Sequence, residues 1–372
     1  MTTATATPKP ASLGDALPFW ASAALLPVLA LSATLGGLAI FLVPMTTWGF
    51  FTILDLLTGE DRSNIDPDTP EARLAWYLRI TRLWPWLQLA ALLALLAYVP
   101  AAPHLSMIEK FGVFFGMGIL AGTIGIVYAH ELMHKPGRAD RWRADILLAS
   151  VLYGHFRTEH MLVHHRHVGT PRDPVTAPYG EGFHAFFARV LPGCFRSALR
   201  AERERLARKG LPATHISNPF WRYAALAVAM IALAIILGGW LGLALFLFQA
   251  LVAIWQLELV NYVEHYGLTR QTLPDGRYEP VAPRHSWNAT HRGSNWLLIN
   301  LQRHADHHAK PARPFPLLQA GSPEEGPELP YGYPVMTTAA LVPPLWRRIM
   351  HPRVKRWRKR FYPDITDWPA RA

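Results

Sequence analysis

Four short stretches of this sequence gather histidine at spacings that suit metal binding. In "HELMHK" (130–135) two histidines lie four residues apart, and "LQRHADHH" (301–308) places one histidine three and four residues before two others. Side chains at these spacings share one face of a helix, so their imidazoles can reach a common ion. "EHMLVHH" (159–165) and "NYVEHYG" (261–267) supply the remaining clusters. The candidate metal ligands are His130, His134, His160, His164, His165, His265, His304, His307 and His308.

Nine imidazoles are enough for two metal ions with four or five ligands each. Imidazole binds zinc, copper, iron and nickel alike, so the ligand type leaves the identity of the metal open. "HELMH" also matches the HExxH pattern of zinc proteases. A protease would not need the seven further histidines, so a metal centre of another kind is favoured.

Composition indicates a membrane protein. The chain has 372 residues, of which 51% are hydrophobic, 12% aromatic and only 17% charged. The apolar residues are grouped in long blocks rather than spread as in a soluble enzyme. The single cysteine, Cys194, excludes a thiolate zinc site or a built-in iron–sulfur or rubredoxin domain. Redox chemistry must therefore use metal held by histidine, or a cofactor from outside.

The apolar blocks predict an all-α membrane protein with six transmembrane helices. Each block has close to the 20 apolar residues needed to cross a hydrocarbon core of about 30 Å, and helix is the only plausible form there. A secretory signal is the alternative for the first block, but a second span follows it at once. The predicted spans are residues 17–34, 37–57, 83–101, 111–130, 220–238 and 241–262.

The basic residues predict the orientation of the spans. Lys and Arg concentrate in 134–143, 195–210 and 346–360, whereas the other linkers carry almost none. By the positive-inside rule these segments and both termini face the cytoplasm. The histidine clusters then lie on the cytoplasmic side, in a cap formed by segments 131–219 and 263–372. The net charge of +11 also raised nucleic acid as a partner, but no nucleic-acid module accompanies it.

The four histidine stretches resemble the signature boxes of the membrane alkane hydroxylases, the alkane 1-monooxygenases. This family belongs to the histidine-box superfamily that includes the membrane fatty-acid desaturases. The resemblance runs from about residue 54 to residue 354, and "NYVEHYGL" with "LQRHADHH" is its most specific part. It implies a single membrane hydroxylase domain over residues 1–372 in a bacterial inner membrane. It also implies a non-haem centre of two iron ions held by the nine histidines, with O2 as co-substrate.

Four acidic residues next to the histidines are expected to support them. Carboxylates beside metal ligands commonly accept the second ring N–H and so fix the imidazole tautomer. The alternative is an ordinary helix-surface or capping carboxylate. The candidates are Glu131, Glu159, Glu264 and Asp306.

The function expected from this resemblance is conversion of the terminal carbon of an alkane to a primary alcohol. An unactivated methyl group offers no acidic or electrophilic handle, so a metal must carry the chemistry. Three alternatives stay open: hydroxylation of a methyl group on an aromatic ring, desaturation of an acyl chain, and metal carriage without catalysis. The substrate should enter from the bilayer through a slot between spans, with Thr47 rather than Trp48 facing the slot.

Electrons must come from another protein, because the chain contains no cysteine cluster and no dinucleotide-binding pattern. The resemblance names rubredoxin, reduced by an NAD(P)H-dependent reductase, as the donor. Rubredoxins are usually acidic, so the arginine-rich stretches 195–210 and 346–360 are candidate docking sites. Attraction to anionic lipid headgroups is the alternative explanation for either stretch.

Overall fold

Five long apolar helical segments form the membrane part of the protein. The structure is a computed structural model that describes residues 12–366 and residue 368. Within those residues the fold is helical, with isolated β-bridges and no sheet. The long segments are Leu13–Leu35, Gly37–Thr58, Glu71–Tyr98, Met107–Met133 and Phe220–His265.

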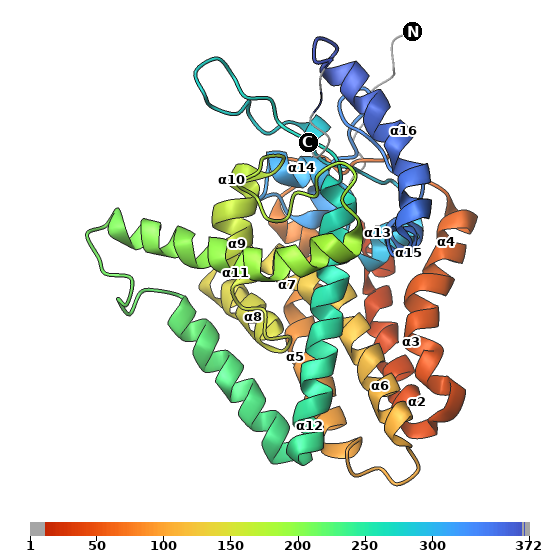
Figure 1. The fold of residues 1–372 in the computed structure, drawn as a ribbon. Coiled ribbons are helices and arrows are strands. Elements are labelled where there is room, and N and C mark those ends of the chain that lie inside the picture. Colours follow the sequence, from red (N-terminus) through yellow and green to blue (C-terminus); the bar gives the residue numbers. More distant parts are fainter. Residues whose placement is uncertain (1–11, 367, 369–372) are drawn as a thin grey trace.

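The last segment, α12 (Phe220–His265), supplies two membrane crossings. Its 46 residues would extend about 69 Å as one straight helix, roughly twice the thickness of a hydrocarbon core. The helix breaks at Gly239, whose φ of 62° and ψ of −156° suit a residue without a Cβ. Figure 1 shows the chain turning back on itself within α12. The predicted spans 220–238 and 241–262 flank this break, so α12 provides two helical arms where the sequence predicts two spans.

The third span begins earlier than the predicted residue 83. A short turn, η4 (Glu71–Leu74), leads into α5 (Ala75–Tyr98). Leu74, Leu78 and Thr81 are buried at helical spacing, so the packed face extends well before the most apolar block. The helix ends at Tyr98 rather than 101, because Pro100 has no N–H with which to continue the helical hydrogen bonds.

Close packing of two glycines fixes the fourth span against the second half of α12. A Cβ atom on Gly118 would lie 2.7 Å from the carbonyl oxygen of Gln249, and one on Gly122 would lie 2.8 Å from that of Ala253. Small residues four apart allow two membrane helices to approach this closely. The contact sets the relative height of the two helices that carry His130 and His265.

Three π-helical segments interrupt the otherwise α-helical chain around one site. They are η3 (Met45–Phe50) in the second span, η5 (Ala121–Ile126) in the fourth and η6 (His160–His164). Such segments are rare and occur mostly at functional sites. The other elements of the second and fourth spans are η2 (Gly37–Phe41), α3 (Leu42–Pro44), α4 (Phe51–Thr58), α6 (Met107–Leu120) and α7 (Val127–Met133).

The first span consists of α1 (Leu13–Ala16), η1 (Leu17–Ala24) and α2 (Leu25–Leu35).

The remaining helices cover one end of the spans and form a cap (Figure 1). The cap helices before α12 are α8 (Arg138–Ala149), α9 (Phe156–Glu159), α10 (His165–His167) and α11 (Phe183–Ala207). Those after α12 are η7 (Pro283–His285), α13 (Arg292–Leu297), α14 (His304–Ala309), η8 (Phe315–Leu317), α15 (Tyr333–Ala340) and α16 (Pro343–Phe361).

Candidate metal centre

The nine candidate histidines converge beneath the cap in two groups. They come from the end of α7, from η6 and α10, from the last turn of α12 and from α14. Within each group the potential ligand nitrogens all lie within 4.8 Å of one another. Group A is His130, His134, His160, His165 and His307, and group B is His164, His265, His304 and His308.

The π-helical segment η6 determines which histidine joins which group. His160 and His164 are four residues apart and would share one face of an α-helix, as the sequence predicts. A π-helix closes its hydrogen bonds over five residues, so His165 follows His160 into group A. The Nε2 atoms of these two histidines are 2.8 Å apart. His164 turns to group B instead, where its ring centre lies 4.8 Å from that of His265.

In group A the ring nitrogens face one another. The Nε2 atom of His134 lies 3.1 Å from that of His160 and 3.3 Å from that of His165. A neutral imidazole has one N–H, so three converging nitrogens cannot all be satisfied by hydrogen bonds among themselves. The buried Nε2 atom of His130 has no hydrogen-bond partner in the described part of the chain. This donor set fits a metal ion, for which neutral imidazole is the commonest ligand.

In group B the ring nitrogens also face one another, and other groups of the protein contact the second nitrogen of two of the rings. The Nε2 atom of His304 lies 3.0 Å from the Nε2 atoms of both His265 and His308. Behind the group, the Nδ1 atom of His164 contacts the Asp173 carboxylate at 3.0 Å. Such contacts fix the tautomer and direct the other nitrogen toward the metal.

A second supporting contact comes from the backbone. The Nδ1 atom of His265 lies 3.3 Å from the carbonyl oxygen of His285, to which it can donate. Neither Asp173 nor the His285 carbonyl is marked by spacing in the sequence. Asp173 lies in a loop nine residues after His164 and was therefore missed, and a backbone oxygen leaves no signal at all.

Among the four carboxylates expected to support the ligands, Glu264 contacts one. Its Oε2 atom lies 3.3 Å from the Nε2 atom of His304, and its Oε1 atom accepts a hydrogen bond of 2.9 Å from the Tyr333 hydroxyl. The contact is to the nitrogen that faces group B, not to the Nδ1 atom behind it. Glu264 therefore lies at the inner side of the ligands.

The other three carboxylates differ from this expectation. Glu131 pairs with Lys135 at 2.7 Å and Asp306 with Arg313 at 2.6 Å, because a nearby cation is within easier reach than an imidazole. Both oxygens of Glu159 are buried and have no hydrogen-bond partner among the described residues. Burial, with Asp173 and Glu258 nearby, raises the pKa of the Glu159 carboxyl well above its usual range.

Burial also keeps the cap histidines neutral, which predicts a pH dependence of stability. Desolvation, reinforced by Lys135, lowers the pKa of His134 to about 3, and burial lowers the pKa values of His307 and His308 well below 6.5. Unfolding then takes up protons below pH 6.5, so the stability of the metal-free protein should fall as pH drops from about 6.5 toward about 3. Each histidine contributes at most about 1.4 kcal/mol per pH unit.

Thermal unfolding of the metal-free protein in detergent measures this effect. The unfolding midpoint should decrease steadily from pH 6.5 to pH 5 and change little between pH 8 and pH 7. A midpoint that stays constant from pH 7 to pH 5 would contradict neutral, buried ligands.

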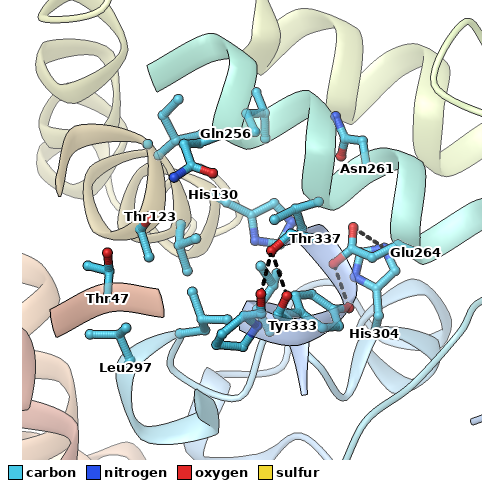
Figure 2. A pocket seen from close by; sticks show the side chains of 18 of the residues that line it. Thr47, Thr123, His130, Gln256, Asn261, Glu264, Leu297, His304, Tyr333 and Thr337 are labelled. Atoms are coloured by element: carbon cyan, nitrogen blue, oxygen red, sulfur yellow. Dashed lines mark hydrogen bonds and ion pairs between the residues drawn. The ribbon is translucent and has the colours of Figure 1, made fainter. Parts of the chain in front are cut away.

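A pocket leads from the second span to both groups of histidines. It is a narrow cavity of about 60 Å³ with a mostly apolar wall. Figure 2 shows Thr47 and Leu297 on one side of the pocket and His304 with Glu264 on the other. All three π-helical segments contribute to its wall. The apolar lining residues include Trp48, Ile126, Val127, Phe156, Leu257, Val260, Leu297, Leu298, Leu301 and Pro334.

Polar side chains lie at the pocket where it meets the metal ligands. His130 and His160 of group A and His304 of group B all line it. Tyr333 and Thr337 of α15 also face it, and no sequence pattern had marked them. An apolar chamber that ends on two groups of nitrogens that could hold metal ions is suited to oxidising an apolar molecule.

Most of this chain is similar in sequence to known proteins. Residues 105–340 match the family model described as fatty acid desaturase. The chain is 38% identical over 331 residues to alkane 1-monooxygenase 2 of Pseudomonas aeruginosa, covering 88% of this chain and 87% of the relative. It is 39% identical over 319 residues to alkane 1-monooxygenase 1 of Alcanivorax borkumensis, covering 85% and 78%. It is also 30% identical over 261 residues to the hydroxylase component of a xylene/toluene monooxygenase of Pseudomonas putida, covering 68% and 67%.

Proposed function

Because this chain belongs to the alkane 1-monooxygenase family, we propose that it hydroxylates the terminal methyl group of n-alkanes to primary alcohols. The proposed reaction consumes one alkane, one O2, two electrons and two protons, and yields the alcohol and water. The observation that carries the proposal is the apolar pocket that touches ligands of both groups.

The nine histidines would hold two iron ions, five at group A and four at group B. Zinc fits the nitrogen ligands equally well but has no redox chemistry, so the reaction favours iron. Bound iron would supply the reducible centre that activates dioxygen for attack on an unactivated C–H bond.

The protein's own residues bind and orient the substrate. The aliphatic wall holds the alkyl chain by burying it from water, with its end at His130, His160 and His304. The same wall keeps water away from the reacting carbon. Asp173 and the His285 carbonyl hold the imidazoles of His164 and His265 toward the other ligands of group B.

We propose that the whole chain, residues 1–372, is one integral-membrane domain of a bacterial inner membrane. The basic segments support an orientation with both termini and the cap in the cytoplasm. The slot between the spans would then receive alkanes that dissolve in the bilayer. Rubredoxin, reduced by an NAD(P)H-dependent reductase, is the proposed electron donor, since the chain has no cysteine cluster of its own.

Analysis of products from cells tests this function. Cells producing the protein with rubredoxin and its reductase should convert octane or hexadecane to the primary alcohol. Xylene as the preferred substrate would support the aromatic alternative, which the resemblance to the xylene/toluene hydroxylase raises. An unsaturated product would identify a desaturase instead and would contradict the proposal.

The longest alkane that the protein oxidises should depend on Thr47. This side chain is buried and lines the pocket from η3, far from the ligands in Figure 2. Trp48 lines the pocket as well, which differs from the expectation that it faces away, and its ring packs against Phe115 and Trp255 of neighbouring spans. Thr47→Trp should fill the far end and shorten the longest alkane oxidised.

The product series from hexane to hexadecane measures this change. Phe50→Ala is the matched control, because Phe50 is 53% exposed on the same helix and does not line the pocket. We expect the control to keep the wild-type range. If Thr47→Trp oxidises the same range of alkanes as the wild type, Thr47 does not limit the length of the alkane.

A further inference from the structure

A second cavity lies behind the segment that carries one of the group B ligands. It has a volume of about 380 Å³ and shares no lining residue with the substrate pocket. Segment 292–304 separates the two, because Leu297, Leu301 and His304 line the pocket whereas its other side lines the cavity. The charged residues that line the cavity are Asp15, Asp61, Arg292 and Arg303.

Arg303 brings a buried positive charge to the wall of this cavity. The residue is only 6% exposed. Its terminal nitrogens donate four hydrogen bonds, to the backbone carbonyls of Leu318, Asp61 and Ser63 and to the side-chain oxygen of Asn64. All four acceptors are neutral, and the Nε atom has no hydrogen-bond partner among the described residues. Since buried charges are normally paired, an anionic group is expected in the cavity.

Three other buried polar atoms in the cavity wall lack a hydrogen-bond partner within the part of the chain that is described. They are the Tyr77 hydroxyl, the Nε atom of Arg292 and the Oδ1 atom of Asn295. The Nε atom of Arg292 lies 3.7 Å from the Asp61 carboxylate, which is too far for a hydrogen bond. Together with Arg303, the wall therefore offers two guanidinium donors, a hydroxyl that can donate and an amide oxygen that accepts.

Both signs of charge line the cavity, so it suits a zwitterion better than a simple anion. Asp15 and Asp61 balance Arg292 and Arg303 in number. A phosphate diester fits the two guanidinium groups and the hydroxyl, because its oxygens accept hydrogen bonds and carry negative charge. A primary ammonium group fits the carboxylates and the amide oxygen, because it only donates. A phosphoethanolamine group contains both parts.

Two tryptophans place the cavity at the boundary of the membrane. The first and third spans begin beside it, and Phe19 and Tyr77 of these spans line it. Next to them, the Nε1 atom of Trp20 donates to the carbonyl oxygen of Trp76 at 2.9 Å, and the two ring centres are 6.2 Å apart. Trp76 is 45% exposed. Because tryptophan is enriched at the headgroup level of membrane spans, a lipid headgroup can reach the cavity while its acyl chains stay in the bilayer.

We propose that this cavity binds the phosphoethanolamine headgroup of a membrane phospholipid. The phosphate accepts hydrogen bonds from Arg292, Arg303 and Tyr77. The ammonium group donates to Asp61 and Asn295. The bound headgroup compensates the buried charge of Arg303 and supports the segment that carries a ligand of group B. This binding does not require the proposed hydroxylation.

Native mass spectrometry of the delipidated protein in detergent measures the Kd of each added lipid. Dioleoyl phosphatidylethanolamine should bind about ten-fold more tightly than the phosphatidylcholine or phosphatidylglycerol with the same chains. Phosphatidylcholine has no ammonium N–H to donate, and phosphatidylglycerol has no positive charge. Soluble phosphoethanolamine should bind more weakly than the lipid, because it lacks the acyl chains.

Two results of this titration would contradict the proposal. Equal Kd values for the three lipids would mean that the cavity does not recognise the headgroup and holds water instead. Soluble phosphoethanolamine that binds as tightly as the lipid would overturn a phospholipid as the source of the group.

Substitutions in the cavity wall locate the binding site. Arg292→Gln and Tyr77→Phe should each weaken binding of the phosphatidylethanolamine about ten-fold, because each removes a donor to the phosphate. Arg79→Gln is the matched control. It removes one guanidinium at the same end of the third span, where Arg79 lies over the Trp76 ring and does not line the cavity. An unchanged Kd in both cavity variants, or an equal loss in the control, would overturn the site.

Thermal unfolding distinguishes loss of the ligand from damage to the fold. The buried Tyr77 hydroxyl contacts no polar group of the described chain, so Tyr77→Phe should keep the wild-type midpoint when no lipid is added. Added phosphatidylethanolamine should raise the midpoint of the wild type more than that of the variant. A variant that is less stable without lipid, yet gains as much from lipid as the wild type, would give the hydroxyl a structural role and overturn its contact with the headgroup.

Discussion

The His304→Ala variant is expected to lose metal from group B and to lose alkane hydroxylation with it. His304 lies 3.0 Å from two other ligands of the group and also lines the pocket, so its removal opens the group on the substrate side. Loss of a support behind a ligand already costs about 10–100-fold in metal affinity, so loss of the ligand should cost more than about 100-fold. Elemental analysis of the purified variant measures the metal directly.

Two histidines outside the groups serve as controls. His104 contacts the Ala33 carbonyl and His184 contacts the Leu341 carbonyl, both away from the pocket. His104→Ala and His184→Ala should keep wild-type metal content and turnover. Full metal content in His304→Ala would remove this residue from the site.

The Asp173→Asn variant should weaken metal binding by about 10–100-fold without removing a ligand. The Asp173 carboxylate contacts the Nδ1 atom of His164 and is itself held by the Thr176 hydroxyl at 2.8 Å. An amide is nearly the same size but lacks the negative charge that favours an N–H at Nδ1. Metal titration of the metal-free variant gives the affinity, and circular dichroism checks that the fold is kept.

Asp306→Asn is the informative comparison. Asp306 lies between ligands in the sequence, yet its carboxylate pairs with Arg313. Its replacement should lower the unfolding temperature and leave the metal affinity close to that of the wild type. A larger loss of affinity in Asp306→Asn than in Asp173→Asn would contradict the contacts described above.

Much of the architecture was predictable because membrane spans and helical spacing leave strong patterns. The lipid core requires long apolar helices, so the six crossings could be read from hydropathy, including the reversal at Gly239. The third span was misplaced at its start because its first turns, around Leu74 and Leu78, are amphipathic and pack against protein. Hydropathy alone does not detect a helix that continues beyond the apolar block.

The histidine groups illustrate what spacing can and cannot tell. All nine histidines come together, yet their division into two groups could not be foreseen. The division depends on η6, where a π-helical turn sends His164 and His165 in different directions. The groups that contact the ligands from outside were harder to predict from the sequence. Glu131 and Asp306 are adjacent to ligands but pair with Lys135 and Arg313, whereas the contact to His164 comes from Asp173 in a loop.

The most direct test of the account is the mass of the product formed from octane under ¹⁸O₂. The experiment uses purified, iron-loaded protein with rubredoxin, its reductase and NADH. The account predicts 1-octanol that carries one ¹⁸O atom, because one oxygen of O2 enters the terminal carbon and the other leaves as water. Octene, or octanol with ordinary oxygen from water, would contradict terminal hydroxylation by dioxygen at this histidine centre.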